Sequence, residues 1–151
     1  MADNVKHLVR VCNTDLNGSK PLAYALRKIK GVGFSFANAV CVFAKVDNNK
    51  VTGTLSPQEV ERLEKAIRSP DALGIPSWMV NRRKDYDTGE DTHLISADLK
   101  FQEENDIKMM KKVKSYKGLR HMKRLPVRGQ KTKSNFRNKK KKGQLGVQRK
   151  K

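Results

Sequence analysis

The stretch Leu26–Val40 reads LRKIKGVGFSFANAV and places two glycines between two segments with helical periodicity. The first segment opens at Pro21, with Ser19 or Lys20 near its cap, and repeats apolar residues at helical spacing: Leu22, Ala25, Leu26 and Ile29. After the glycines, Ser35 is a candidate N-cap for FANAVCVFAKV, which is apolar on nearly all sides. The pattern predicts two helices joined by a Gly-x-Gly turn, with the second helix at the centre of the core.

A Gly-x-Gly turn between helices can present backbone N–H groups and a helix N-terminus to a phosphate. Lys28 and Lys30 lie next to Gly31 and Gly33 in the sequence and support this interpretation. The same glycines also suit a tight turn between packed helices that meets no ligand. The sequence leaves both possibilities open.

The segments on either side predict an all-α fold of about four helices. Val5–Asn13 is typical of a short extended segment, and the residues from Asp15 to Pro21 are interpreted as a turn. Ser56-Pro57-Gln58-Glu59 is a strong helix start, with an N-cap serine, proline at the first helical position and a capping-box glutamate. Residues 70–96 are expected to be irregular. A long helix is expected over about 97–116, ending at Gly118 and burying Leu99, Ile107, Met110 and Val113.

Charge divides the chain more sharply than apolar content does. The 151 residues include 34 Lys and Arg against 15 Asp and Glu, for a net charge of +19. All 15 acidic residues lie within residues 1–106, whereas residues 107–151 hold 19 basic residues and no acidic one. A charge this large predicts a permanent anionic partner. We therefore expect a helical body over 1–117 and an extended basic tail over 118–151.

The tail has features that a simple polycation lacks. Lysine and arginine attract phosphates without regard to sequence. A segment this polar cannot bury enough apolar surface to offset the entropy lost when it becomes ordered. An import signal or a solubilising tail would account for the lysines of 138–142. It would not account for Leu125–Asn135, where Arg128 offers forked donors, Gly129 permits a close backbone approach and Gln130 can bond to a sugar or base. Phe136 can stack on a base or enter an apolar crevice.

The remaining candidate sites have simpler interpretations. Asn81–Asp91 is rich in carboxylates but lacks the glycine and glutamate of a calcium loop, so it predicts a solvated loop with Arg–Asp pairing. Arg82 and Arg83 are possible phosphate contacts there. Trp78 is interpreted as a core residue rather than as a stacking platform. The two cysteines are interpreted as reduced thiols. The two cysteines and three histidines are too scattered to predict a metal site, and we expect no cofactor and no catalytic site.

Three segments resemble one known family. KGLRHMKRLPVRGQKTKSN (Lys117–Asn135) resembles the signature of small-subunit ribosomal protein thirteen, and LRKIKGVGFSFANAV resembles the glycine turn of that family. GIPSWMVNRRKDYDTGED (Gly74–Asp91) is similar to its archaeal and eukaryotic branch, called number eighteen in the older eukaryotic scheme. Arg124 departs from the family, which usually has glycine or another small residue there.

The resemblance implies a helix-two-turns-helix body, a long helix and an extended tail. It also implies a cytoplasmic ribosomal location in the head of the small subunit, bound to small-subunit ribosomal RNA, and no membrane contact. Its implied partners are small-subunit protein nineteen, large-subunit protein five at an intersubunit bridge, and peptidyl-site transfer RNA near the tail. The expected RNA-binding residues are Lys117, Arg120, His121, Lys123, Arg124, Arg128, Gly129, Gln130, Lys131, Thr132, Lys133, Asn135, Arg137, Lys139, Lys140, Lys141 and Lys142.

Two other functional classes carry some of the same features. DNA-repair glycosylases share the helical motif, but they need a nucleophilic N-terminal proline or a catalytic lysine with an acid, and usually a zinc finger. This sequence starts Met-Ala-Asp, and its two cysteines are 29 positions apart. A chromatin-type DNA-binding protein shares the charge but not the Lys117–Asn135 motif. The sequence therefore favours a structural RNA-binding protein over an enzyme.

Overall fold

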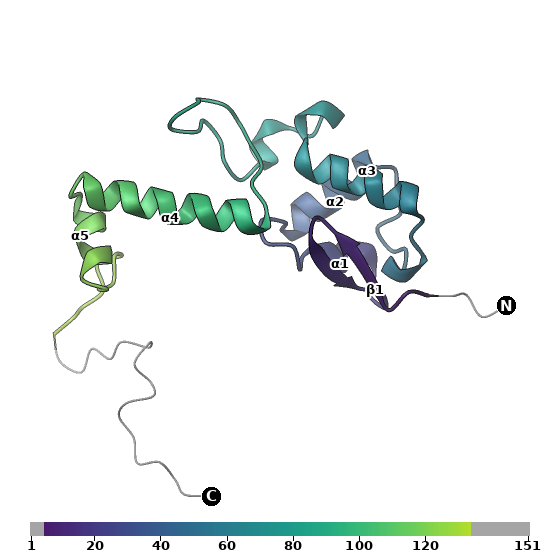
Figure 1. The fold of residues 1–151 in the computed structure, drawn as a ribbon, viewed down its shortest axis with the longest axis horizontal. Coiled ribbons are helices and arrows are strands. Elements are labelled where there is room, and N and C mark those ends of the chain that lie inside the picture. Colours follow the sequence, from purple (N-terminus) through teal and green to yellow (C-terminus); the bar gives the residue numbers. More distant parts are fainter. Residues whose placement is uncertain (1–4, 134–151) are drawn as a thin grey trace, which may run out of the picture. The chain divides into compact units, whose positions relative to one another are not determined.

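A small hairpin and helices α1 to α3 enclose the apolar core (Figure 1). This computed structural model describes residues 5–133, and the chain divides into unit 1, up to Glu103, and unit 2, from Glu104. The elements are β1 (Leu8–Val11), β2 (Thr14–Asn17), α1 (Leu22–Leu26), α2 (Phe34–Phe43), α3 (Pro57–Arg68), α4 (Ser96–Lys112) and α5 (Tyr116–Met122). Single-turn 3₁₀ helices cover Thr52–Thr54, Asp71–Leu73 and Ser77–Met79. The fold is mostly helical, as predicted, with one added two-stranded sheet.

The hairpin corrects the prediction of a turn from Asp15 onward. β1 is the expected extended segment, but β2 pairs with it antiparallel, with Val11 opposite Thr14 and Val9 opposite Leu16. Cys12 and Asn13 form the two-residue connection, both with positive φ (46° and 58°), which matches the twist of paired strands. A carboxylate oxygen of Glu64 on α3 accepts the Cys12 N–H at 2.8 Å and holds this connection in place.

The two helices around the glycines form as predicted, with different ends. α1 begins after Pro21, which is its N-cap, and α2 is capped by Gly33 rather than by Ser35. α2 packs against α1 and α3 and buries Phe36, Ala37, Val40 and Cys41. Its opposite side, with Phe34 and Val42, is exposed, so α2 borders the core on one face only.

α3 begins as the sequence predicts. The Ser56 hydroxyl accepts the Glu59 N–H at 3.2 Å, and the Glu59 carboxylate accepts the Ser56 N–H at 2.8 Å, which completes the capping box. Leu63 and Ile67 are fully buried on one face of the helix. An ion pair of 2.7 Å with Lys50 further fixes Glu59, and the Lys50 hydrogen bond lowers the pKa of that carboxyl.

The long helix ends earlier than predicted, at Lys112. Lys114 takes a left-handed φ of 55°, and the Ser115 N–H donates to the Met110 carbonyl, which closes the helix with a Schellman motif. Ser115 then caps α5 by accepting the Gly118 N–H at 3.2 Å. Gly118 is buried inside α5. Its Cα lies so close to α4 that a Cβ there would be 2.1 Å from the Met110 carbonyl oxygen, so the position requires glycine. Val113, expected in the core, is 69% exposed.

Candidate RNA interface

α5 and the segment that follows it form an acid-free, basic arm in unit 2. The described residues 107–133 contain no carboxylate side chain. Of the predicted RNA-binding residues, Arg120 and His121 are half-buried, and the following are exposed: Lys117, Lys123, Arg124, Arg128, Gly129, Gln130, Lys131, Thr132 and Lys133. Asn135, Arg137, Lys139, Lys140, Lys141 and Lys142 lie outside the described residues, as does Phe136.

Arg120 and Arg124 shape the arm where it leaves α5. The Arg120 Nε–H donates to the Pro126 carbonyl at 2.9 Å, and its guanidinium lies 5.9 Å from the centre of the Tyr116 ring. Arg124 takes a left-handed φ of 55°, while the Leu125 N–H donates to the Arg120 carbonyl at 2.9 Å. The turn before Leu125 therefore forms with arginine, and not a small residue, at position 124.

Further along the arm, Gly129 has a φ of 74°, a region that favours glycine. The Gln130 side-chain oxygen accepts the Arg128 N–H at 3.2 Å, so that oxygen is used within the arm. These contacts give 125–130 a defined backbone path with the Arg128 side chain exposed.

The two glycines of the Gly-x-Gly turn have different surroundings. Gly31 has a φ of 98°, and a Cβ there would lie 2.5 Å from the Leu94 carbonyl oxygen. The Lys30 carbonyl accepts the Ser96 N–H at 2.9 Å, so this side of the turn packs against the chain leading into α4. A Cβ at Gly33 would meet nothing within 4 Å. Gly31 therefore contacts protein, and the space beside Gly33 is open.

Lys28 and Lys30 line a recess that also includes Lys100, a residue that the sequence did not single out. The recess has a volume of about 390 Å³ and is completed by Thr14, Ser96 and Ala97 at the start of α4. Lys100 lies close enough to Lys30 to lower its pKa. Three lysines thus surround one recess, and the Lys28 ammonium also donates to the Asp15 carbonyl at 2.5 Å.

The loop from Asn81 to Asp91 is internally paired, as predicted. Arg82 forms an ion pair of 2.7 Å with Asp85, and the Arg82 hydrogen bond lowers the pKa of that carboxyl. The Lys84 N–H donates to the Asp91 carboxylate at 2.7 Å. Arg82 is therefore engaged within the loop, whereas Arg83 is exposed.

The position of Trp78 differs from the prediction. Its side chain, expected in the core, is 68% exposed in the 3₁₀ helix Ser77–Met79. Ile75 and Val80, close to it in sequence, are buried instead. The segment is buried at its two ends, Ile75 and Val80, and Trp78 lies in the exposed turn between them.

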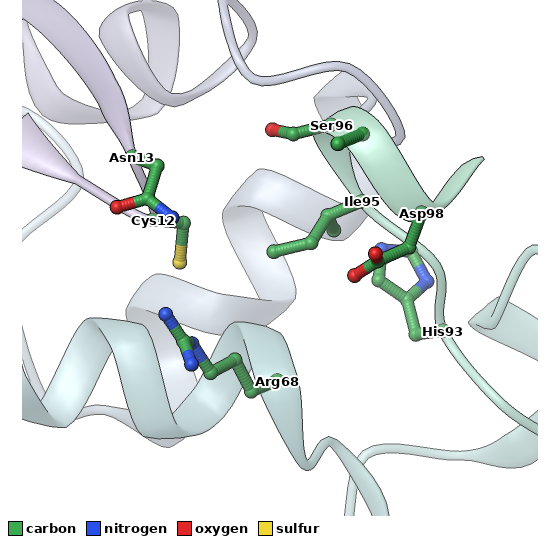
Figure 2. Close-up of a pocket in the computed structure, with 8 residues that line it drawn as sticks. Cys12, Asn13, Arg68, His93, Ile95, Ser96 and Asp98 are labelled. Carbon is green, nitrogen blue, oxygen red and sulfur yellow. The ribbon is translucent and has the colours of Figure 1, made fainter. Parts of the chain in front are cut away.

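A cavity of about 380 Å³ in unit 1 places several polar side chains together (Figure 2). Figure 2 shows the Cys12 thiol and the Arg68 guanidinium pointing toward one another. Burial raises the pKa of the Cys12 thiol, and it raises that of Cys41 to about 11, so both side chains are neutral thiols. Among residues 5–133, no three His, Cys, Asp or Glu side chains gather as they would around a metal ion.

His93 lines the same cavity and is 8% exposed. Its ring stacks on Phe36 with centroids 3.8 Å apart, and its Nδ1 accepts the Asn81 N–H at 3.4 Å. Burial lowers the pKa of His93 to about 4, so the imidazole is neutral near pH 7. His93 is therefore a buried packing residue and not a general base.

The family model for ribosomal protein S13/S18 matches residues 10–138. The chain belongs to the ribosomal protein S13/S18 family. It is 50% identical over 151 residues to small ribosomal subunit protein uS13 of Methanothermobacter thermautotrophicus, which covers 100% of this chain and 99% of that protein. It is 50% identical to uS13 of Methanocaldococcus jannaschii over 132 residues, 87% of this chain and 88% of the relative. For uS13 of Thermofilum pendens the identity is 51% over 134 residues, 89% and 85% of the two chains.

Membership of the S13/S18 family makes the chain a small-subunit ribosomal protein that acts in the cytoplasm within the ribosome. Proteins of this family are structural constituents and not enzymes, and they bind ribosomal RNA as part of the subunit. The family match covers both the Gly31–Gly33 turn and the basic arm. No helix in the described part of the chain combines the length and apolar character that a membrane crossing requires.

Proposed function

We propose that the basic arm is the main contact of this chain with small-subunit ribosomal RNA, in the head of the subunit. The observation that carries the proposal is a run of lysines and arginines over residues 107–133, most of them exposed, without a single carboxylate. Such a surface neutralises phosphates and releases their counterions. Because unit 2 buries only Gly118 among its described residues, RNA supplies contacts that a core of its own does not.

Within the arm, we propose that Arg128, Gly129 and Gln130 form a shaped contact, and that Lys139 to Lys142 add charge. The internal Arg128–Gln130 hydrogen bond and the left-handed Gly129 support this distinction, because they fix the backbone around the exposed Arg128 side chain. We further propose that the basic tail, residues 118–151, approaches transfer RNA at the peptidyl site. Its lysines suit a mobile anionic partner, since they require no fixed partner geometry.

Exposed apolar side chains support two proposed protein contacts. Tyr116, Leu119 and Met122 are exposed on α5, and they would suit small-subunit protein nineteen. Trp78 is exposed in unit 1, and tryptophan is enriched at the energetic centres of protein interfaces. We assign Trp78 to the intersubunit bridge with large-subunit protein five.

The RNA contact is tested by rebinding the chain to small subunits stripped of it, followed by sedimentation after a high-salt wash. We expect the unmodified chain to stay bound, and Arg128→Ala to lower the bound fraction more than Lys141→Ala does. Lys141 has neighbouring lysines that can replace it, so it serves as the charge-matched control. Equal losses from the two variants would show that the arm contributes charge alone and has no shaped contact at Arg128. Release of the unmodified chain by the high-salt wash would contradict the proposed function.

A further inference from the structure

An exposed pair of aromatic rings lies beside the Gly31–Gly33 turn, and neither ring has a role in the core. Tyr24 on α1 is 56% exposed and Phe34 at the start of α2 is 50% exposed. Their ring centroids are 6.1 Å apart with a tilt of 58°. The Arg27 guanidinium lies 5.9 Å from the centre of the Phe34 ring. Two large apolar rings held together in solvent, with a cation on one of them, indicate a surface built to be covered.

The charges around the rings identify what covers them. A hollow of about 270 Å³ next to Tyr24 is lined by Lys20, Arg27 and Lys28, and no carboxylate side chain lines it. Lys28 also lines the neighbouring recess, together with Lys30 and Lys100. Three cationic side chains therefore line the hollow next to Tyr24, and Lys28 connects this hollow to the recess that contains Lys30 and Lys100. Exposed aromatic rings next to basic depressions are an arrangement by which proteins bind unpaired RNA.

The lysine recess has the features of a phosphate position. Lys100 lies close enough to Lys30 to lower the pKa of the Lys30 ammonium, and Glu103 offsets this only in part. A phosphate placed between them would relieve that repulsion. Thr14 and Ser96 supply hydroxyl groups at the same recess.

We propose that Tyr24 and Phe34 stack an unpaired base of RNA, and that the adjoining phosphate enters the recess formed by Lys28, Lys30 and Lys100. The inference rests on the proposed function, since it assigns part of the RNA contact to unit 1. It adds four residues that the sequence did not single out for RNA: Tyr24, Arg27, Phe34 and Lys100. It also gives the site a preference for unpaired over paired RNA, because a base in a duplex cannot leave its stack without cost.

The test uses the full chain and a single-stranded RNA hexamer with one central 4-thiouridine. After irradiation, crosslinked peptides are mapped by mass spectrometry, and affinity is measured over a range of salt concentrations. We expect crosslinks to the peptides that contain Tyr24 and Phe34 as well as to the basic arm. The double variant Tyr24→Ser, Phe34→Ser should lose the former crosslinks and weaken high-salt binding at least about fivefold, with little change in the salt slope.

Two comparisons separate stacking from phosphate binding. Lys100→Ala should lower the salt slope by about 0.7 and keep the crosslinks, because it removes one phosphate contact with a single strand. Tyr86→Ser is the control for losing an exposed aromatic ring, since Tyr86 is 76% exposed among the carboxylates of its loop, and it should change nothing. Thermal unfolding of each variant checks that the exposed substitutions leave the fold intact.

The outcomes distinguish the inference from the function on which it rests. Crosslinks confined to residues 107–151, with unchanged binding by the double variant, would overturn the aromatic site and leave the basic arm as the RNA contact. Failure of the unmodified chain to bind the hexamer at any salt concentration would contradict the proposed function and the aromatic site together.

Discussion

Gly31 and Gly33 differ in what a side chain would meet, although they stand two positions apart in the same turn. Gly31→Ala places a Cβ 2.5 Å from the Leu94 carbonyl oxygen in a residue whose φ is 98°. We expect a loss of about 2–4 kcal/mol in the free energy of unfolding, measured by urea denaturation. Gly33→Ala is the matched control: its φ is −91° and the space beside it is open, so we expect a change within about 0.5 kcal/mol. Equal losses would contradict the assignment of Gly31 to internal packing.

His93 gives the stability of unit 1 a defined pH dependence. Its folded pKa of about 4 lies below the ordinary value of 6.5, so between these values the unfolded chain binds more protons. The free energy of unfolding should therefore fall as the pH falls from about 6.5 to about 4, by up to roughly 3 kcal/mol from this residue. His93→Phe should flatten that part of the profile, whatever its effect at pH 7.

The control for this experiment is His7→Asn, because His7 is exposed. Carboxylates such as Glu59 also lose stabilising interactions on acidification, and they do so equally in all three proteins. The difference between the profiles therefore isolates His93. A His93→Phe profile parallel to the wild-type one would contradict the neutral, buried imidazole.

At the scale of single elements, local signals were predictable and tertiary ones were not. The α3 start follows from four adjacent residues, Ser56 to Glu59, whose hydrogen bonds close within the same turn. The hairpin was missed because its connection, Cys12-Asn13, lacks the usual turn glycine and is held by Glu64, 52 positions away. Lys100 was missed for a similar reason: it is 70 positions from Lys30 in the sequence, and only the fold brings the two residues to the same recess.

Trp78 shows a different limit of sequence reasoning. Tryptophan is most often buried, and the neighbouring Ile75 and Val80 indeed are. The backbone of the 3₁₀ helix Ser77–Met79 determines which residue of the segment faces outward, and the sequence does not predict this helix. The core residues of α3, by contrast, were predictable because helical spacing alone places Leu63 and Ile67 on one face.

The end of α5 offers a test of an element boundary. Arg124 holds a left-handed φ of 55°, where a non-glycine residue is strained. Arg124→Gly should stabilise the turn by about 0.5–1 kcal/mol and raise the helicity of residues 116–122, measured by Cα chemical shifts in the full chain. Lys123→Gly is the control: Lys123 has a φ of −78°, so glycine there should lower the helicity instead. An increase with both variants would contradict the role of the left-handed cap.

At the scale of the whole molecule, the apolar core and the net positive charge occupy different parts of the chain. Every residue of the apolar core lies in unit 1, whereas residues 107–151 hold 19 of the 34 basic residues. Stability and RNA affinity should therefore respond to different substitutions. The exposed aromatic rings and the lysine recess of unit 1 are the exception, since they add RNA contact to the part of the chain that carries the core.

A chain that ends at Lys112 separates the two properties. It keeps unit 1 and all of α4 but lacks 16 lysines and arginines. We expect cooperative thermal unfolding with a midpoint within about 2 °C of the full chain, because no core contact is removed. Its affinity for single-stranded RNA should fall steeply, and so should the salt dependence of that affinity. Residual binding should come from unit 1 and should disappear when Tyr24→Ser, Phe34→Ser and Lys100→Ala are added. Loss of cooperative unfolding would instead show that the basic arm stabilises the body, and that the two properties are not separable.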